Sequence, residues 1–234
     1  MFEKNIVKYR PPFILLYGEH KVGKSTICSQ FPEPAFLDLE DNINHVEGVL
    51  RKRIVSYPEY MTAINEIKKT YKKDKLPFKT LIIDSATVLE KLVEEYIVGS
   101  KEKGIGSIPH GAGYGRLWNM YHHALLKLKT DLIPLGIIVV VIAHKAFRAE
   151  EDSTVRPTIR AISDRNRDAV NQANFDQVLY MTLDKSGRRV FITQQTTDYY
   201  AGGIFNNIPA KMSADVKNLL GFIKDYYKAY NITT

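Results

Sequence analysis

Short apolar runs alternate along the chain with longer segments of helical periodicity. The apolar runs have the length and composition of buried strands, and they occur at 13–17, 35–39, 81–83 and 137–143. Apolar residues recur at helical spacing in three segments, at 58–73, 86–98 and 116–130. Strands that alternate with helices predict an α/β fold, with a mainly parallel sheet flanked by helices on both faces.

The last third of the chain predicts a different local pattern. Two strands are expected at 177–183 and 189–193, joined by the hairpin signal Asp-Lys-Ser-Gly at 184–187. A closing amphipathic helix is expected at 213–230, with Ser213 as its N-cap. No long linker, repeat or low-complexity block interrupts the chain. We therefore expect one domain over 1–234, with its core at 13–212 and an antiparallel hairpin at one edge.

Composition narrows the class of protein. With 44% hydrophobic and 25% charged residues, the chain is not disordered as a whole. A disulfide scaffold is excluded because Cys28 is the only cysteine, which also indicates a reducing compartment. The most apolar stretch, 132–143, is too short to span a bilayer, and the N-terminus carries charge where a signal peptide needs an apolar run. We expect a soluble cytoplasmic protein with no membrane partner.

The strongest motif follows the first predicted strand. Residues 18–25 read Gly-Glu-His-Lys-Val-Gly-Lys-Ser, which fits the phosphate-loop pattern G-x-x-x-x-G-K-[ST] in full. Its glycines let successive N–H groups face an anion, Lys24 would reach the β- and γ-phosphates, and Ser25 would coordinate Mg²⁺. We expect ATP and Mg²⁺ as cofactors. The expected nucleotide-binding residues are Gly18, Glu19, His20, Lys21, Val22, Gly23, Lys24, Ser25 and Thr26.

Acidic residues end two of the predicted strands. Asp84 closes the strand at 81–83, where a carboxylate can hold the hydration shell of Mg²⁺ beside the phosphate loop. Asp38 and Glu40 share one side of the strand at 35–39, and Asp41 lies in the loop beyond. These three carboxylates are candidates for orienting an attacking water, and the alternative is a solvated acidic loop. No metal-ligand spacing is found among the histidines, so no zinc site is expected.

Together, the segments at 17–26, 36–40 and 82–85 resemble the RecA-like ATPase core. The chain looks more closely like the RecA-like, AAA-type ATP-binding proteins of phages and prophages, including single-strand annealing ATPases, over roughly 13–212. The resemblance implies that Glu40 is the catalytic base and that His144, at the end of the strand at 137–143, senses the γ-phosphate. With Lys24, they form the expected catalytic set. The alternative is that His144 is a structural histidine at a strand end, with its hydrogen bonds satisfied and no role as a sensor.

In RecA-like cores, two mobile loops contact single-stranded DNA, and their counterparts here are 99–115 and 145–174. Six of the fourteen glycines fall in the first, which is expected to be a flexible surface loop. The second has basic residues interleaved with Phe147, as suits a single-strand groove, although acidic residues reduce its net charge. An arginine-rich solvated loop or a subunit contact is the alternative. The candidate DNA contacts are Lys145, Arg148, Arg156, Arg160, Arg165 and Arg167.

One feature departs from the RecA pattern, in which lysines on the last hairpin strand and just beyond it reach the γ-phosphate of a neighbouring subunit. Residues 190–203 contain no lysine or arginine. The role would then fall to Arg188, Arg189 or Lys211 in the homo-oligomer that the resemblance implies, with ATP near the subunit interface.

Three functions are consistent with these motifs. The first is a RecA-like ATPase that binds single-stranded DNA and supports annealing or recombination in a bacterium or a phage-infected cell; the formal net charge of +7 permits a polyanionic partner. The second is a small-molecule kinase that uses 155–167 as an arginine-bearing lid. The third is a scaffold whose assembly is controlled by nucleotide without significant turnover.

Overall fold

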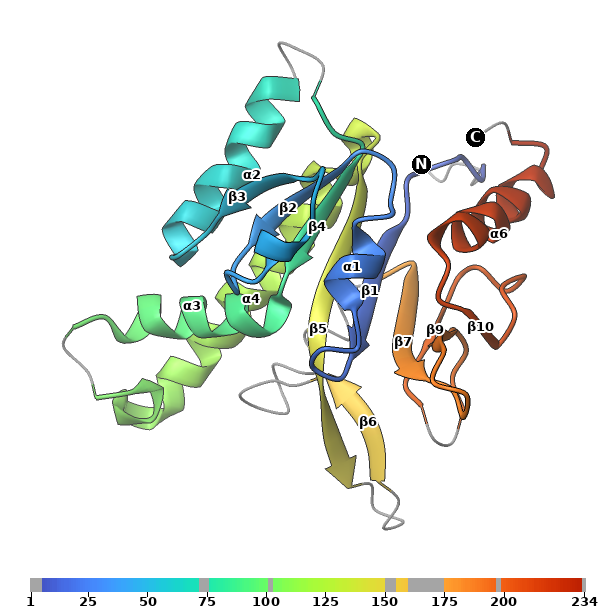
Figure 1. Cartoon of the computed structure of the whole chain (residues 1–234). Coiled ribbons are helices and arrows are strands. Elements are labelled where there is room, and N and C mark those ends of the chain that lie inside the picture. Colours follow the sequence, from blue (N-terminus) through green and yellow to red (C-terminus); the bar gives the residue numbers. More distant parts are fainter. Residues whose placement is uncertain are drawn as a thin grey trace.

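A mainly parallel sheet forms the centre of the computed structural model, which describes residues 6–71, 76–100, 103–149, 155–159, 175–196 and 199–232 (Figure 1). Its strand order is β10–β8–β7–β1–β5–β4–β2–β3, with β6 paired to β5 and β9 to β7. The strands are β1 (Phe13–Gly18), β2 (Pro34–Asp38), β3 (Leu50–Arg53), β4 (Thr80–Asp84), β5 (Ile138–Ala149), β6 (Val155–Ile159), β7 (Gln177–Leu183), β8 (Arg189–Ile192), β9 (Gly202–Gly203) and β10 (Lys211–Ser213).

Helices cover both faces of this sheet. They are α1 (Lys24–Cys28), α2 (Tyr57–Tyr71), α3 (Ala86–Val98), α4 (Ala112–Asp131) and α6 (Val216–Lys228), with short 3₁₀ turns η1 (Ile43–His45), η2 (Ile105–Ser107), η3 (Pro109–Gly111) and η4 (Ile133–Leu135). Alternate residues of β1 divide between two apolar layers. Phe13 and Leu15 pack in the layer of α2, α3 and α4, whereas Ile14 and Leu16 pack in the layer of α1 and α6. The predicted α/β fold class is confirmed.

The register of the parallel strands brings their carboxyl ends into one row. Gly18, at the end of β1, is paired with His144 of β5, and Asp84 of β4 is paired with Asp38 of β2. Because β5 lies between β1 and β4, the phosphate loop and the acidic strand ends meet at the same edge of the sheet. Ligands of open α/β sheets bind at this edge.

The segment after Ala143 is a strand where a polar stretch was expected. β5 continues to Ala149 and pairs antiparallel with β6, so that Lys145 stands opposite Ile159 and Ala149 opposite Val155. In Figure 1 the β5–β6 ribbon extends beyond the lower end of the sheet, away from α6. The sequence after Ala143 did not predict a strand, because a two-stranded ribbon outside the core needs no apolar run.

Two other expectations are wrong in detail. Residues 112–115 of the expected flexible loop form the first turn of α4, where Gly113 is buried and a Cβ would lie 2.6 Å from the Ile105 carbonyl oxygen. This glycine therefore serves close packing. Ser213 is not the cap of the closing helix, because it belongs to β10 and pairs with β8. The cap is Asp215, whose carboxylate accepts the Asn218 N–H at 2.7 Å.

The hairpin of β7 and β8 confirms the predicted strands at 177–183 and 189–193. Its turn is held by Asp184, whose carboxylate accepts hydrogen bonds from the backbone N–H groups of Ser186 and Arg188 at 2.8 Å and 2.9 Å. In the part of the chain that the structure describes, no helix is both long and apolar enough to cross a bilayer.

Truncation of a central core side chain tests this architecture. Ile82 of β4 is fully buried in the layer that contains α1, so Ile82→Ala should lower the free energy of unfolding by about 2–5 kcal/mol. Val55→Ala, at a side chain that is 61% exposed, is the matched control and should change it by less than about 0.5 kcal/mol. Urea denaturation followed by circular dichroism measures both, and equal losses would contradict the assigned core.

Candidate nucleotide-binding site

A cavity of about 450 Å³ opens at the carboxyl edge of the sheet, beside the phosphate loop. Five segments contribute to it: the β1–α1 loop with α1, the β2–η1 connection with η1, and the strands β4, β5 and β8. The lining residues are His20, Lys21, Gly23, Lys24, Ser25, Thr26, Glu40, Asn42, His45, Asp84, His144 and Arg189. The cavity therefore combines cations of the phosphate loop with the acidic ends of the neighbouring strands.

Lys24 is buried in the curl of its own loop. Its ammonium group donates to the carbonyl oxygens of Glu19 at 2.7 Å and Gly18 at 3.2 Å. Burial lowers the pKa of Lys24, while the carboxylates of Asp84 and Glu40 act in the opposite direction. The loop thus holds a cation at the floor of the cavity, where a phosphate anion can reach it.

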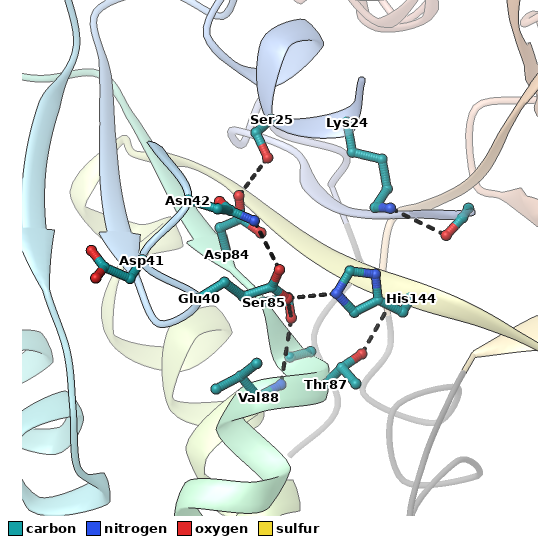
Figure 2. A network of polar contacts seen from close by, with 12 residues as sticks. Lys24, Ser25, Glu40, Asp41, Asn42, Asp84, Ser85, Thr87, Val88 and His144 are labelled. Carbon is teal, nitrogen blue, oxygen red and sulfur yellow. Dashed lines mark hydrogen bonds and ion pairs between the residues drawn. The ribbon is translucent and has the colours of Figure 1, made fainter. Parts of the chain in front are cut away.

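Ser25 and Asp84 place a hydroxyl group and a carboxylate next to each other near Lys24. The Ser25 hydroxyl donates to Asp84 Oδ2 at 2.6 Å, as Figure 2 shows. Burial raises the pKa of Asp84 to about 6, although the hydrogen bond from Ser25 opposes this effect. Hydroxyl and carboxylate oxygens are ligands that Mg²⁺ prefers. The two residues therefore fit the ion that the phosphate loop implies.

Glu40 is held in the cavity by three side chains (Figure 2). His144 Nε2 lies 2.6 Å from Glu40 Oε1, the Ser85 hydroxyl donates to the same oxygen, and Asn42 Nδ2 donates to Oε2 at 2.9 Å. Burial raises the pKa of Glu40, but the hydrogen bonds from His144 and Ser85 outweigh it and leave this pKa below its ordinary value. Glu40 is therefore a positioned carboxylate that can accept a hydrogen bond.

His144 connects this carboxylate to the phosphate loop. Its ring stacks on that of His20, with centroids 3.7 Å apart and planes inclined by 14°. Its backbone N–H donates to Thr87 Oγ1 at 3.0 Å, which fixes the middle of β5 against α3. The adjacent Lys145 forms an ion pair with Glu19. Two consecutive residues of the phosphate loop are thus attached to two consecutive residues of β5, at the base of the β5–β6 ribbon.

The other two candidate carboxylates lie elsewhere. Asp38 is fully buried, and its Oδ1 accepts the backbone N–H groups of Glu40 and Asp41 at 3.2 Å and 2.8 Å. Its Oδ2 pairs with Arg51 of β3 at 2.7 Å. Asp41 is exposed and pairs with the same arginine. Asp38 therefore shapes the turn that carries Glu40 and does not line the cavity.

The structure brings together most of the residues expected at the site. Lys24, Ser25, Glu40, Asp84 and His144 all line one cavity, together with His20, Lys21, Gly23 and Thr26 of the phosphate loop. Gly18, Glu19 and Val22 belong to the loop without lining it. Asn42 and His45, which line the cavity, and Ser85, which contacts Glu40, could not be predicted as site residues, because their positions beside Glu40 and Asp84 are known only from the structure.

The candidate DNA contacts are only partly described. Lys145 lies at the base of the ribbon, and Arg148 and Arg156 are opposite each other in its register. The remaining three, Arg160, Arg165 and Arg167, lie outside the described residues. The α3–α4 connection, which holds most of the described part of 99–115, lies apart from the ribbon in Figure 1. Among the described residues, the backbones of the two predicted DNA loops lie in different parts of the molecule.

A complete phosphate loop, an acidic strand end paired to its serine and a mainly parallel sheet define a P-loop nucleotide-binding protein. Residues 10–204 match the family described as AAA domain, and the chain belongs to that family. Its match to a curated protein, the SPbeta prophage-derived uncharacterized protein YorG of Bacillus subtilis (strain 168), is 27% identical over 134 residues. The match covers 57% of this chain and 41% of that relative, so less than half of the relative is spanned.

The raised pKa of Asp84 predicts how stability without nucleotide depends on pH. Burial disfavours the ionised form of Asp84 in the folded protein, so ionisation lowers the free energy of unfolding. This loss is absent below the ordinary pKa of 3.8 and is complete once the pH has risen past about 6. Asp84→Asn removes the charge. Its gain in unfolding free energy over wild type should be larger at pH 8 than at pH 4.5 by about 2 kcal/mol.

Urea denaturation at the two pH values measures this difference. Asp225→Asn, at an exposed carboxylate on α6, is the matched control and should show the same offset from wild type at both. An Asp84→Asn gain that does not change with pH would show that Asp84 is not the buried ionising group.

Proposed function

We propose that this protein hydrolyses ATP and couples hydrolysis to the binding of single-stranded DNA in annealing or recombination. The observation that carries the ATPase part is the position of Glu40, a carboxylate fixed by His144, Ser85 and Asn42 in the cavity of the phosphate loop. Membership of the AAA domain family supports nucleotide use. The DNA part rests on the basic ribbon and on the resemblance to RecA-like phage proteins.

In this mechanism the phosphate loop binds the triphosphate, and Lys24 exchanges its two carbonyl partners for phosphate oxygens. Ser25 and Asp84 would hold the magnesium ion, which neutralises phosphate charge when bound. Glu40 accepts a hydrogen bond from the attacking water, orients it and takes its proton. The proton acceptor is ready at neutral pH because hydrogen bonds from His144 and Ser85 keep the pKa of Glu40 low.

His144 is proposed to report the state of the nucleotide to the DNA ribbon. It contacts Glu40 on one side and His20 of the phosphate loop on the other, and the next residue of β5 begins the ribbon. A change in the γ-phosphate that moves Glu40 or His20 would shift His144 and the strand that carries it. ATP binding would thereby favour one position of the ribbon and hydrolysis another.

The ribbon itself has a feature suited to a polyanion. Arg148 and Arg156 are directly opposite in the β5–β6 register. The ribbon therefore carries two arginines at one position of its register, and a phosphate backbone binds basic residues with release of its counterions. A homo-oligomer with ATP near the subunit interface, as in the RecA-like resemblance, would align several ribbons along one strand.

The kinase alternative requires a lid over the nucleotide. Within the described part of the expected lid, Val155–Ile159 pairs with β5 as a ribbon strand. Release of phosphate without an added acceptor separates an ATPase from a kinase. The scaffold alternative differs only in turnover, which the Glu40 variant tests.

Glu40→Gln should lower kcat for ATP hydrolysis by roughly 10²–10⁴-fold while ATP still binds, because the amide keeps the shape of the side chain and loses the proton acceptor. Phosphate release measures turnover, and fluorescence of a labelled ATP measures binding. Lys24→Ala provides the blank, and Glu47→Gln, at an exposed carboxylate that does not line the cavity, is the matched control. Wild-type turnover in Glu40→Gln would rule out Glu40 as base, and no turnover in wild type would favour the scaffold.

For the DNA part, single-stranded DNA should stimulate ATP hydrolysis by the wild-type protein. The double variant Arg148→Ala/Arg156→Ala should bind that DNA more weakly and reduce the slope of log affinity against log salt by about 1.4, or 0.7 for each lost phosphate contact. Fluorescence anisotropy of a labelled oligonucleotide measures both quantities. Lys217→Ala/Lys224→Ala removes the same charge from exposed positions on α6, away from the ribbon, and should leave the slope unchanged. Equal slopes in the two double variants would place DNA elsewhere.

A further inference from the structure

Arg189 is joined to the phosphate loop of its own chain. It is the first residue of β8 and stands opposite Leu183 of β7, which in turn pairs with β1. Its Nε donates to the carbonyl oxygen of Val22, in the loop that follows β1, at 2.8 Å. The resemblance to RecA-like proteins made Arg189 a candidate for contact with the nucleotide of a neighbouring subunit, whereas in the structure it contacts the loop of its own chain.

The guanidinium group lies directly against the loop at Gly23. A Cβ at that position would lie 2.7 Å from Arg189 Nε and 2.9 Å from Cζ, closer than such atoms approach each other. Gly23 also has a φ of 100°, which an L side chain rarely adopts. The glycine before Lys24 therefore leaves room for this arginine, and Arg189 lines the same cavity as Lys24, Ser25 and Thr26.

No carboxylate compensates this charge within the described part of the chain. The carbonyl of Val22 engages Nε, which leaves the two terminal nitrogens of the guanidinium fork to face another acceptor. The adjacent Arg188 differs, since it pairs with Asp184 at 3.1 Å, its side chain is 81% exposed, and it does not line the nucleotide cavity. A planar fork with two unused donors matches the geometry of phosphate oxygens.

We infer that Arg189 binds the phosphates of the nucleotide held by its own chain, so that Lys24 and Arg189 contact the triphosphate from two sides of the loop. This inference rests on the proposed nucleotide binding and adds a residue to that site. Arg189 also gives the nucleotide site a second cationic side chain beside Lys24, although residues 190–203 contain no lysine or arginine. The arginine acts in cis and needs no neighbouring subunit.

The first test is equilibrium binding of fluorescent mant-ATP with Mg²⁺. Arg189→Ala should weaken binding by roughly 10–100-fold, because a charge-assisted hydrogen bond to phosphate is lost. Arg189→Lys should weaken it less, since it keeps the charge without the fork. Arg188→Ala is the matched control and should bind within about twofold of wild type. Thermal unfolding of each variant checks that the fold is intact.

The second test separates cis from trans action. Lys24→Ala and Arg189→Ala proteins are mixed in equal amounts, and mant-ATP binding is measured again. If Arg189 served a neighbouring subunit, the Lys24→Ala protein would supply its arginine and restore tight binding at the Arg189→Ala sites. We expect no restoration, because each defect stays within its own chain. Restored binding would overturn the cis assignment.

The outcomes for this residue and for the proposed function are distinguishable. If wild type fails to bind mant-ATP, or if Lys24→Ala binds as well as wild type, nucleotide binding at the phosphate loop is wrong. If wild type binds and Lys24→Ala does not, but Arg189→Ala and Arg189→Lys both bind like wild type, the inference on Arg189 alone is wrong. Loss in Arg188→Ala equal to that in Arg189→Ala would also overturn it, since it would indicate a general effect of hairpin charge.

Discussion

The site depends on how three carboxylates are accommodated at the carboxyl edge of one sheet. Asp38, Asp84 and Glu40 lie close enough that the charges of Asp38 and Glu40 both raise the pKa of Asp84. Each carboxylate has its own partner, which removes part of the cost of burying it. Arg51 pairs with Asp38, Ser25 donates to Asp84, and His144 and Ser85 hold Glu40. Residues from four strands and the phosphate loop are thereby fixed relative to one another.

This constraint explains the polar edge strand β3. Its sequence, Leu-Arg-Lys-Arg, has no apolar alternation, and Leu50 is 46% exposed. The strand nevertheless pairs parallel with β2, which places Arg51 and Arg53 beside the β2 turn. Arg51 neutralises Asp38, and Arg53 Nη1 donates to the Asp38 carbonyl oxygen at 3.0 Å. Charge compensation at the end of β2, rather than core packing, accounts for the composition of β3.

Strands with apolar runs and the phosphate loop could be predicted from the sequence, whereas polar strands and contacts between distant segments could not. Buried parallel strands carry apolar runs, so β1, β2, β4 and the first part of β5 were predicted, and the phosphate loop supplied Lys24 and Ser25. The polar strands β3, β6 and β10 left no such pattern, because their side chains serve ion pairs, a ribbon outside the core or a sheet edge. Arg189 was not predicted as a cavity residue, nor Ser85 as a partner of Glu40, since each depends on contacts between segments distant in sequence. His144 was predicted from the resemblance as a sensor of the γ-phosphate, and its contact with Glu40 is seen only in the structure.

Glu19 links nucleotide binding to the ribbon through two different groups. Its carbonyl oxygen accepts a hydrogen bond from Lys24, and its carboxylate pairs with Lys145. A triphosphate that attracts the Lys24 ammonium competes with that carbonyl, so the loop can no longer be held at Glu19 by Lys24. The loop is anchored differently at Gly23, where Arg189 holds the Val22 carbonyl from β8. Movement on nucleotide binding is therefore expected on the Glu19 side of the loop, which is the side joined to β5 and to the base of the ribbon.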